Sequence, residues 1–104
     1  MQLVTDTYLI TNTFPKEEVF GLTSQIKRSI ISVACNIAEG FGRKSGKEFV
    51  RFLNISIGSL FEYQTQIEIA RNIKFISEED FNQLYEKSRE IEIMIVSFSN
   101  KINH

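Results

Sequence analysis

The sequence of 104 residues has no tryptophan, one cysteine, one proline and one histidine. A single cysteine, Cys35, cannot form an internal disulfide, which favours a reducing, cytoplasmic setting. The single histidine, His104, stands at the last position, where chain ends are poorly held, so we expect no histidine-dependent triad or zinc site. One proline and five glycines are too few for a turn-rich β protein.

The signatures of membrane insertion and of catalysis are also missing. No basic and then apolar leader opens the chain, and no apolar run is long enough to span a bilayer, so we expect a soluble, unexported protein without a membrane partner. There is no phosphate-binding loop, no Ser-His-Asp set and no Glu-x-x-His signature of a di-metal site. Cys35 lies among small residues, where buried packing is expected over reactivity. We therefore expect no enzyme, no cofactor and no metal.

What the sequence does contain is helical periodicity. Apolar residues recur every three or four positions in four segments, and long neighbouring stripes joined by short loops indicate antiparallel bundle packing. The sequence predicts an all-α protein, an antiparallel up-and-down four-helix bundle that forms a single domain over residues 1–104. Its helices are expected at about residues 2–13, 23–41, 46–72 and 78–102.

The helix ends are marked by local signals. Pro15 should end the first helix, because the residue before proline avoids the α region. Gly40 and Gly42 suit the end of the second. Ser45 to Glu48 has the form of a capping box for the third, and Ser77, followed by three acids, caps the fourth. The hydroxyls of residues 23–24 are expected to cap the second helix.

Apolar residues outside the main stripes widen the expected core. A wide apolar face on a small bundle favours a homo-oligomer, although these residues can also simply broaden the core. They are Ile31, Ile55, Ile57, Ile69, Ile93, Met94 and Val96.

Two polar residues stand near the apolar stripe of the second helix. Asn36 is expected to bond across helices and fix their register, and Glu39 to pair with Arg43 or with a base on the third helix. This structural role as internal polar ties is favoured over ligand or RNA contact.

Charge is distributed unevenly in a chain whose net charge is −1. The stretch from Lys27 to Arg51 holds six bases and two acids, whereas the chain from Ser77 onward holds three bases and six acids. A net acidic chain argues against wholesale nucleic-acid binding, but the basic stretch predicts a local phosphate-binding patch. The alternative, to which we give equal weight, is that these bases only cap helices and remain solvated.

The candidate nucleic-acid-binding residues flank the turn between the second and third helices. Arg43, Lys44 and Lys47 border the turn, Arg51 follows one helical turn later, and Arg28 is included because a tilted second helix would bring it to the same side. Phe41 and Phe49 lie nearby, and core packing is expected for both rather than base stacking.

The order of several motifs resembles the four-helix family called 23S ribosomal RNA intervening-sequence proteins. The residues that carry the resemblance are 14–18, 21–26, Ser32 with 36–43, 48–53, 58–60, Glu62 and Gln66. Relatives usually open with further residues of the first helix, and a proline common between the serine and the asparagine is replaced here near Ala34-Cys35.

The resemblance implies a homo-oligomer, specifically a pentamer. Some family members are encoded within inserted segments of large ribosomal RNA genes. Relatives act as accessory variability-determinant proteins of retroelements, in which a basic pentamer binds nucleic acid and a reverse transcriptase. We therefore expect a non-enzymatic oligomeric module that binds structured RNA or a ribonucleoprotein; a protein-protein scaffold without nucleic-acid binding is the alternative.

Overall fold

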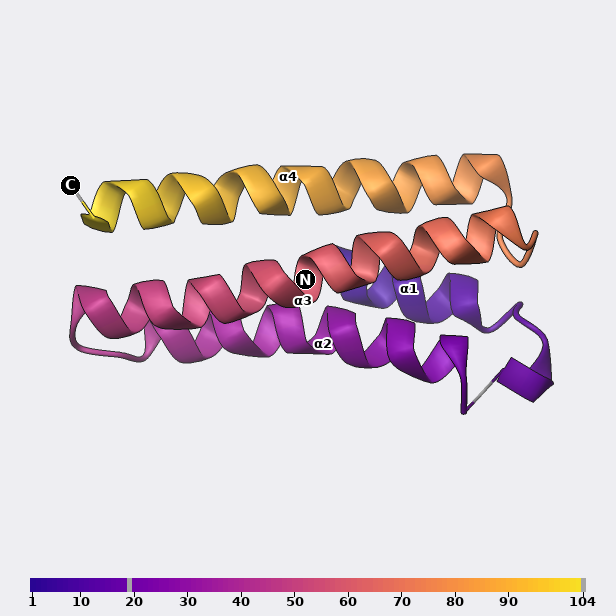
Figure 1. Ribbon diagram of the computed structural model, residues 1–104, viewed down its shortest axis with the longest axis horizontal. Helices are drawn as coiled ribbons and strands as arrows, with labels where there is room; N and C mark the ends of the chain where they lie inside the picture. The colour runs from indigo at the N-terminus through magenta and orange to yellow at the C-terminus, as the bar shows by residue number, and fades with distance from the viewer. Residues whose placement is uncertain (19, 104) are drawn as a thin grey trace.

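A computed structural model describes residues 1–18 and 20–103, and it confirms the all-α bundle. Four α-helices run up and down, with α1 at Gln2–Thr11, α2 at Leu22–Phe41, α3 at Gly46–Asn72 and α4 at Glu78–Asn103. A 3₁₀ turn, η1 at Lys16–Glu18, lies between α1 and α2. Both α1 and α3 pack between α2 and α4, so the helices follow one another around the bundle (Figure 1). His104 lies outside the described residues.

The two serine caps form as expected. Ser45 accepts a hydrogen bond from the Glu48 backbone N–H at 3.2 Å, and Ser77 accepts one from the Asp80 N–H at 3.0 Å. In each case a side-chain oxygen satisfies an amide that the first turn of a helix leaves unpaired.

The start of α2 differs from the expectation of a hydroxyl cap. The helix begins at Leu22, and the Leu22 N–H donates to the carboxylate of Glu18 at 3.3 Å. The cap therefore comes from the preceding 3₁₀ turn, which brings an acid to the positive end of the helix dipole. The first helix also ends earlier than the expected residue 13, because Thr13 and Phe14 continue from Thr11 as tight turns with bonds to carbonyls three residues back.

The core follows the apolar stripes of all four helices. Its members are buried at the helix contacts, and Tyr63 is the largest side chain among those fully enclosed. Of the apolar residues outside the main stripes, Ile57 packs against this core, and the other six are exposed. The buried hydrophobic residues are Leu3, Phe14, Ile26, Ile30, Val33, Leu53, Leu60, Tyr63, Ile67, Ala70, Ile76, Phe81, Leu84 and Ile95.

Two polar contacts attach α1 to the rest of the bundle. The Tyr63 hydroxyl of α3 lies 2.7 Å from Thr7 Oγ1, and Thr7 in turn donates to the Leu3 carbonyl at 2.7 Å. Asp6 forms an ion pair with Lys87 of α4. The hydrogen bond from Lys87, helped by one from Gln2, lowers the pKa of Asp6. Burial raises the pKa of Tyr63 far above its ordinary value.

The short first helix leaves half of the bundle with three helices. Ten residues of α1 extend about 15 Å, whereas the molecule is 44 Å long. Figure 1 shows α1 beside the first half of α2, while the α2–α3 turn and the end of α4 lie together at the opposite end. None of the helices among the described residues is long and apolar enough to cross a membrane.

Candidate nucleic-acid interface

The α2–α3 turn is positioned by a close approach of the two helices. Gly40 is buried, and a Cβ at this position would lie 3.3 Å from the Cβ of Phe52 and 3.5 Å from the carbonyl oxygen of Phe49. A glycine here therefore lets the end of α2 rest directly on α3. Residues 42–45 then reverse the chain and place Arg43, Lys44 and Lys47 at one end of the bundle.

Two of the predicted basic residues stack on one aromatic ring. The guanidinium groups of Arg43 and Arg51 lie 4.8 and 5.2 Å from the ring centroid of Phe52. Arg43 also pairs with Glu39 at 2.9 Å, and Arg51 pairs with Glu48 at 3.2 Å. These surface pairs are worth little in stability, but they offset part of the charge at this end.

The lysines of the turn are less engaged. Lys44 and Lys47 are exposed, and within residues 1–18 and 20–103 neither forms an ion pair. The last turn of α4 adds Lys101. A Cβ at Gly46 would meet the side chain of Ile102 at 2.8 Å, which shows that the end of α4 touches the start of α3. Lysines from α4 and from the turn therefore share one end of the bundle.

Arg28 does not join this group. It lies thirteen positions before Phe41 on the same helix, a rise of about 20 Å. Its neighbours line a polar groove between α2 and α3 that includes Gln25, Ser32, Glu62 and Gln66. A tilt of α2 cannot overcome this separation, because distance along a helix axis is set by residue spacing.

Asn36 and Glu39 differ from their expected roles as internal ties. Asn36 donates within α2, to the carbonyl of Ser32 at 2.8 Å, and the contact across the helices is made instead by Ser32 and Ser59 at 2.9 Å. The serine stands one turn earlier, where α2 faces α3. Glu39 pairs with Arg43 as expected, but both side chains are exposed, so this is a surface pair.

Short hydroxyl side chains also link α2 to α3, and helical periodicity alone did not single them out. Ser29 donates to Gln66 at 2.8 Å, and Ser56 donates to the carbonyl of Val33 at 2.9 Å. Ser56 is fully buried. The available signal was its place in an apolar stripe, where a polar residue needs a partner.

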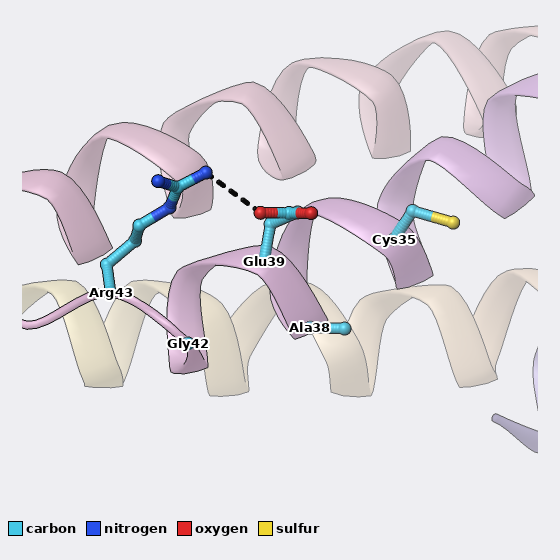
Figure 2. A pocket seen from close by; sticks show the side chains of 5 residues that line it. All are labelled: Cys35, Ala38, Glu39, Gly42 and Arg43. Atoms are coloured by element: carbon cyan, nitrogen blue, oxygen red, sulfur yellow. Dashed lines mark hydrogen bonds and ion pairs between the residues drawn. The ribbon is translucent and has the colours of Figure 1, made fainter.

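A shallow depression on the outer side of α2 contains Cys35. Figure 2 shows the five residues that line it, with the Arg43 guanidinium directed at Glu39. Cys35 is exposed, which contradicts the expectation that it is buried. The carboxylate and the guanidinium in this depression already pair with each other, so no free acid-base pair faces the opening. Across the described residues, no three His, Cys, Asp or Glu side chains gather as a metal site would require.

The two phenylalanines near the turn have different environments. Phe49 is half-buried and packs against the core, whereas Phe41 is 60% exposed. The expectation of core packing is therefore wrong for Phe41. Phe41 is the last residue of α2, and Figure 1 shows α1 only beside the first half of that helix, so α1 does not reach this end of the bundle.

Comparisons with known proteins agree on the fold. A family model described as "23S rRNA-intervening sequence protein" matches residues 1–97. A solved structure from Bacteroides thetaiotaomicron, described as a protein with unknown function from the S23 ribosomal protein family, has a TM-score of 0.80 and 24% sequence identity. The match covers 94% of this chain and 88% of that one. No curated protein sequence matches the chain.

Proposed function

The chain belongs to the 23S rRNA-intervening sequence protein family, and from that premise we propose that it is a non-enzymatic, oligomeric module of the cytoplasm that binds structured RNA or a ribonucleoprotein. The observation that carries the proposal is the gathering of Arg43, Lys44, Lys47 and Arg51 at one end of the bundle, beside Lys101. Cations so placed can neutralise neighbouring phosphates of one RNA strand.

The lysines and the arginines of this group have different contacts, and we assign them different roles in binding. Lys44 and Lys47 are the primary phosphate ligands, because they are exposed and, among the described residues, carry no carboxylate partner. Arg43 and Arg51 keep their positions on the Phe52 ring and contribute through the field of the patch. Arg28 is too far along α2 to touch the same phosphates.

Oligomerisation is part of the proposal. The outer face of α3 carries three exposed apolar residues, Ile55, Phe61 and Ile69. Gly58 lies on the same face, and a Cβ added to it would have no neighbouring atom within 4 Å. Such a face suits a contact with another helix. Repetition of one weak basic patch around a ring, five-fold as the family resemblance implies, would raise its avidity for a long RNA.

The test is salt-dependent binding of a fluorescently labelled RNA hairpin, measured by anisotropy between about 50 and 200 mM salt. The double change Lys44→Glu with Lys47→Glu should weaken binding and should reduce the slope of log K against log salt by about 1.4, the value for two lost single-strand phosphate contacts. The matched control, Lys16→Glu with Arg28→Glu, makes the same charge change away from the patch and should leave that slope nearly unchanged. No binding by the wild type at low salt, or equal losses in both variants, would contradict the proposal.

A scaffold that binds only protein is the second candidate. It is favoured by the pairing of Arg43 and Arg51 with Glu39 and Glu48, which makes these bases surface ion pairs rather than phosphate ligands. A scaffold should purify as an oligomer with a protein partner and without nucleic acid. The mass of the particle in solution and its 260/280 nm absorbance ratio separate the two candidates.

A further inference from the structure

Phe41 is an exposed aromatic ring held in place by other aromatic rings. It is the last residue of α2, and its ring centroid lies 4.9 Å from that of Phe49 and 6.0 Å from that of Phe98, with interplanar angles of 76° and 84°. Edge-to-face contacts of this kind are favourable and directional. The ring is therefore anchored by α3 and α4, while more than half of its surface remains open to solvent.

Three cations stand close to Phe41 along the chain, in the α2–α3 turn and the first turn of α3. Arg43 and Lys44 follow it directly after Gly42, and Lys47 stands in the first turn of α3. A protein helix that covered Phe41 with an apolar face would also approach the end of the bundle that carries these cations. An unpaired nucleotide matches both features, because its base has an aromatic face and its phosphates are negative.

We infer that Phe41 is a stacking platform for one unpaired base of the bound RNA, with Lys44 and Lys47 on the adjoining phosphates. This inference rests on the proposed function and deepens it by naming the ligand class, which is RNA with unpaired nucleotides. Bases within a duplex stack on each other, and the deep, narrow major groove of A-form RNA does not admit side chains. The end of the bundle that carries Phe41, Lys44 and Lys47 (the basic end) should therefore prefer a single strand or a loop to a blunt duplex.

The experiment measures binding of a single-stranded RNA and of the blunt duplex of the same sequence by anisotropy. Phe41→Leu keeps an apolar side chain against its neighbours but removes the aromatic face. It should lower the affinity for the single strand at least about 5-fold, the lower end of what one base–aromatic stack contributes, and leave duplex binding unchanged. Phe41→Trp should restore the single-strand preference. Phe20→Leu removes another exposed ring, which lies just before α2 and therefore at the end of that helix away from the basic turn, and should have no effect on either RNA.

A second measurement changes the RNA instead of the protein, so its result does not depend on whether a variant folds. Abasic substitutions along the single strand remove stacking faces without touching the protein, and they should weaken binding to the wild type but not to Phe41→Leu. If both RNAs bind the wild type equally and Phe41→Leu changes neither affinity, the inference is wrong while the proposed function stands. If no RNA binds, the proposed function has failed. If Phe41→Asp instead dissociates an oligomer, Phe41 is a contact between copies, and the inference is overturned.

Discussion

The contact between Thr7 and Tyr63 allows a quantitative test of what holds α1 in place. Thr7 has one hydroxyl proton, and it is donated to the Leu3 carbonyl. The hydrogen bond between the two side chains must therefore be donated by the Tyr63 hydroxyl and accepted by Thr7. Both side chains are fully buried, so water cannot replace either partner.

Because Tyr63 donates and Thr7 accepts, Tyr63→Phe and Thr7→Val should lower the free energy of unfolding by different amounts. Tyr63→Phe removes the donor and leaves Thr7 still bonded to Leu3, so it should cost about 0.5–1.5 kcal/mol, as for one ordinary hydrogen bond. Thr7→Val removes the acceptor and strands a buried tyrosine hydroxyl, which costs about 1–3 kcal/mol. In the double variant no hydroxyl is stranded, so its cost should fall below the sum of the two single changes, with a coupling of about 0.5–3 kcal/mol.

Urea unfolding followed by circular dichroism at 222 nm measures all three variants. The midpoint should shift at a constant denaturant slope, since the surface exposed on unfolding hardly changes. For a domain of this size each 1 kcal/mol should also lower Tm by about 4–8 °C. Ser24→Ala, at a half-buried hydroxyl outside this network, is the control. Additive costs, or a larger loss for Tyr63→Phe than for Thr7→Val, would refute the assigned direction of the bond.

Two further predictions concern acid stability and the glycines. The hydrogen bond from Lys87 lowers the pKa of Asp6 below its ordinary value of 3.8. The contribution of Asp6 to the free energy of unfolding is therefore fully present above pH 3.8 and is lost as the pH falls through the lower, folded-state pKa. Asp6→Asn should flatten this acid limb of the free energy of unfolding, whereas Glu17→Gln, at an exposed residue, should not. Gly58→Ala should stabilise α3 by about 0.5–1 kcal/mol through helix propensity, and Gly40→Ala should gain less, because its Cβ would lie 3.3 Å from Phe52 Cβ. A loss at Gly58 would instead indicate close contact with another copy.

Local rules were sufficient for most of the helices. The caps at Ser45 and Ser77 depend only on residues within one turn, and a serine followed by acids shows them in the sequence. The start of α2 was harder, because its cap is the Glu18 carboxylate, which reaches Leu22 only after η1 has turned the chain. A cap supplied from a preceding turn leaves no local pattern at the helix start.

The candidate site depended on register and on helix length. Periodicity placed Asn36 near the α2–α3 contact, but only the packed helices show that Ser32 is the residue that meets Ser59. Sequence proximity grouped Arg28 with the basic turn, although the rise of α2 separates them. Phe41 continues an apolar stripe, so the sequence predicted burial, but the residue is exposed at the end of α2, which α1 does not reach.

The length of α1 therefore separates stability from binding in this bundle. Where α1 is present, Thr7 and Asp6 tie it to α3 and α4 through a buried hydroxyl pair and an ion pair. Where it is absent, the three remaining helices present Phe41 and the cations of the α2–α3 turn. Changes at the first group should lower the free energy of unfolding and leave the RNA affinity of the folded fraction intact. Changes at the second group should lower the RNA affinity and leave the free energy of unfolding nearly unchanged, since a side chain that is mostly exposed contributes little burial to the core. A variant such as Thr7→Val that unfolds more easily yet binds RNA with unchanged affinity and salt slope would demonstrate the separation, and a parallel loss of both properties would show that α1 also shapes the basic end.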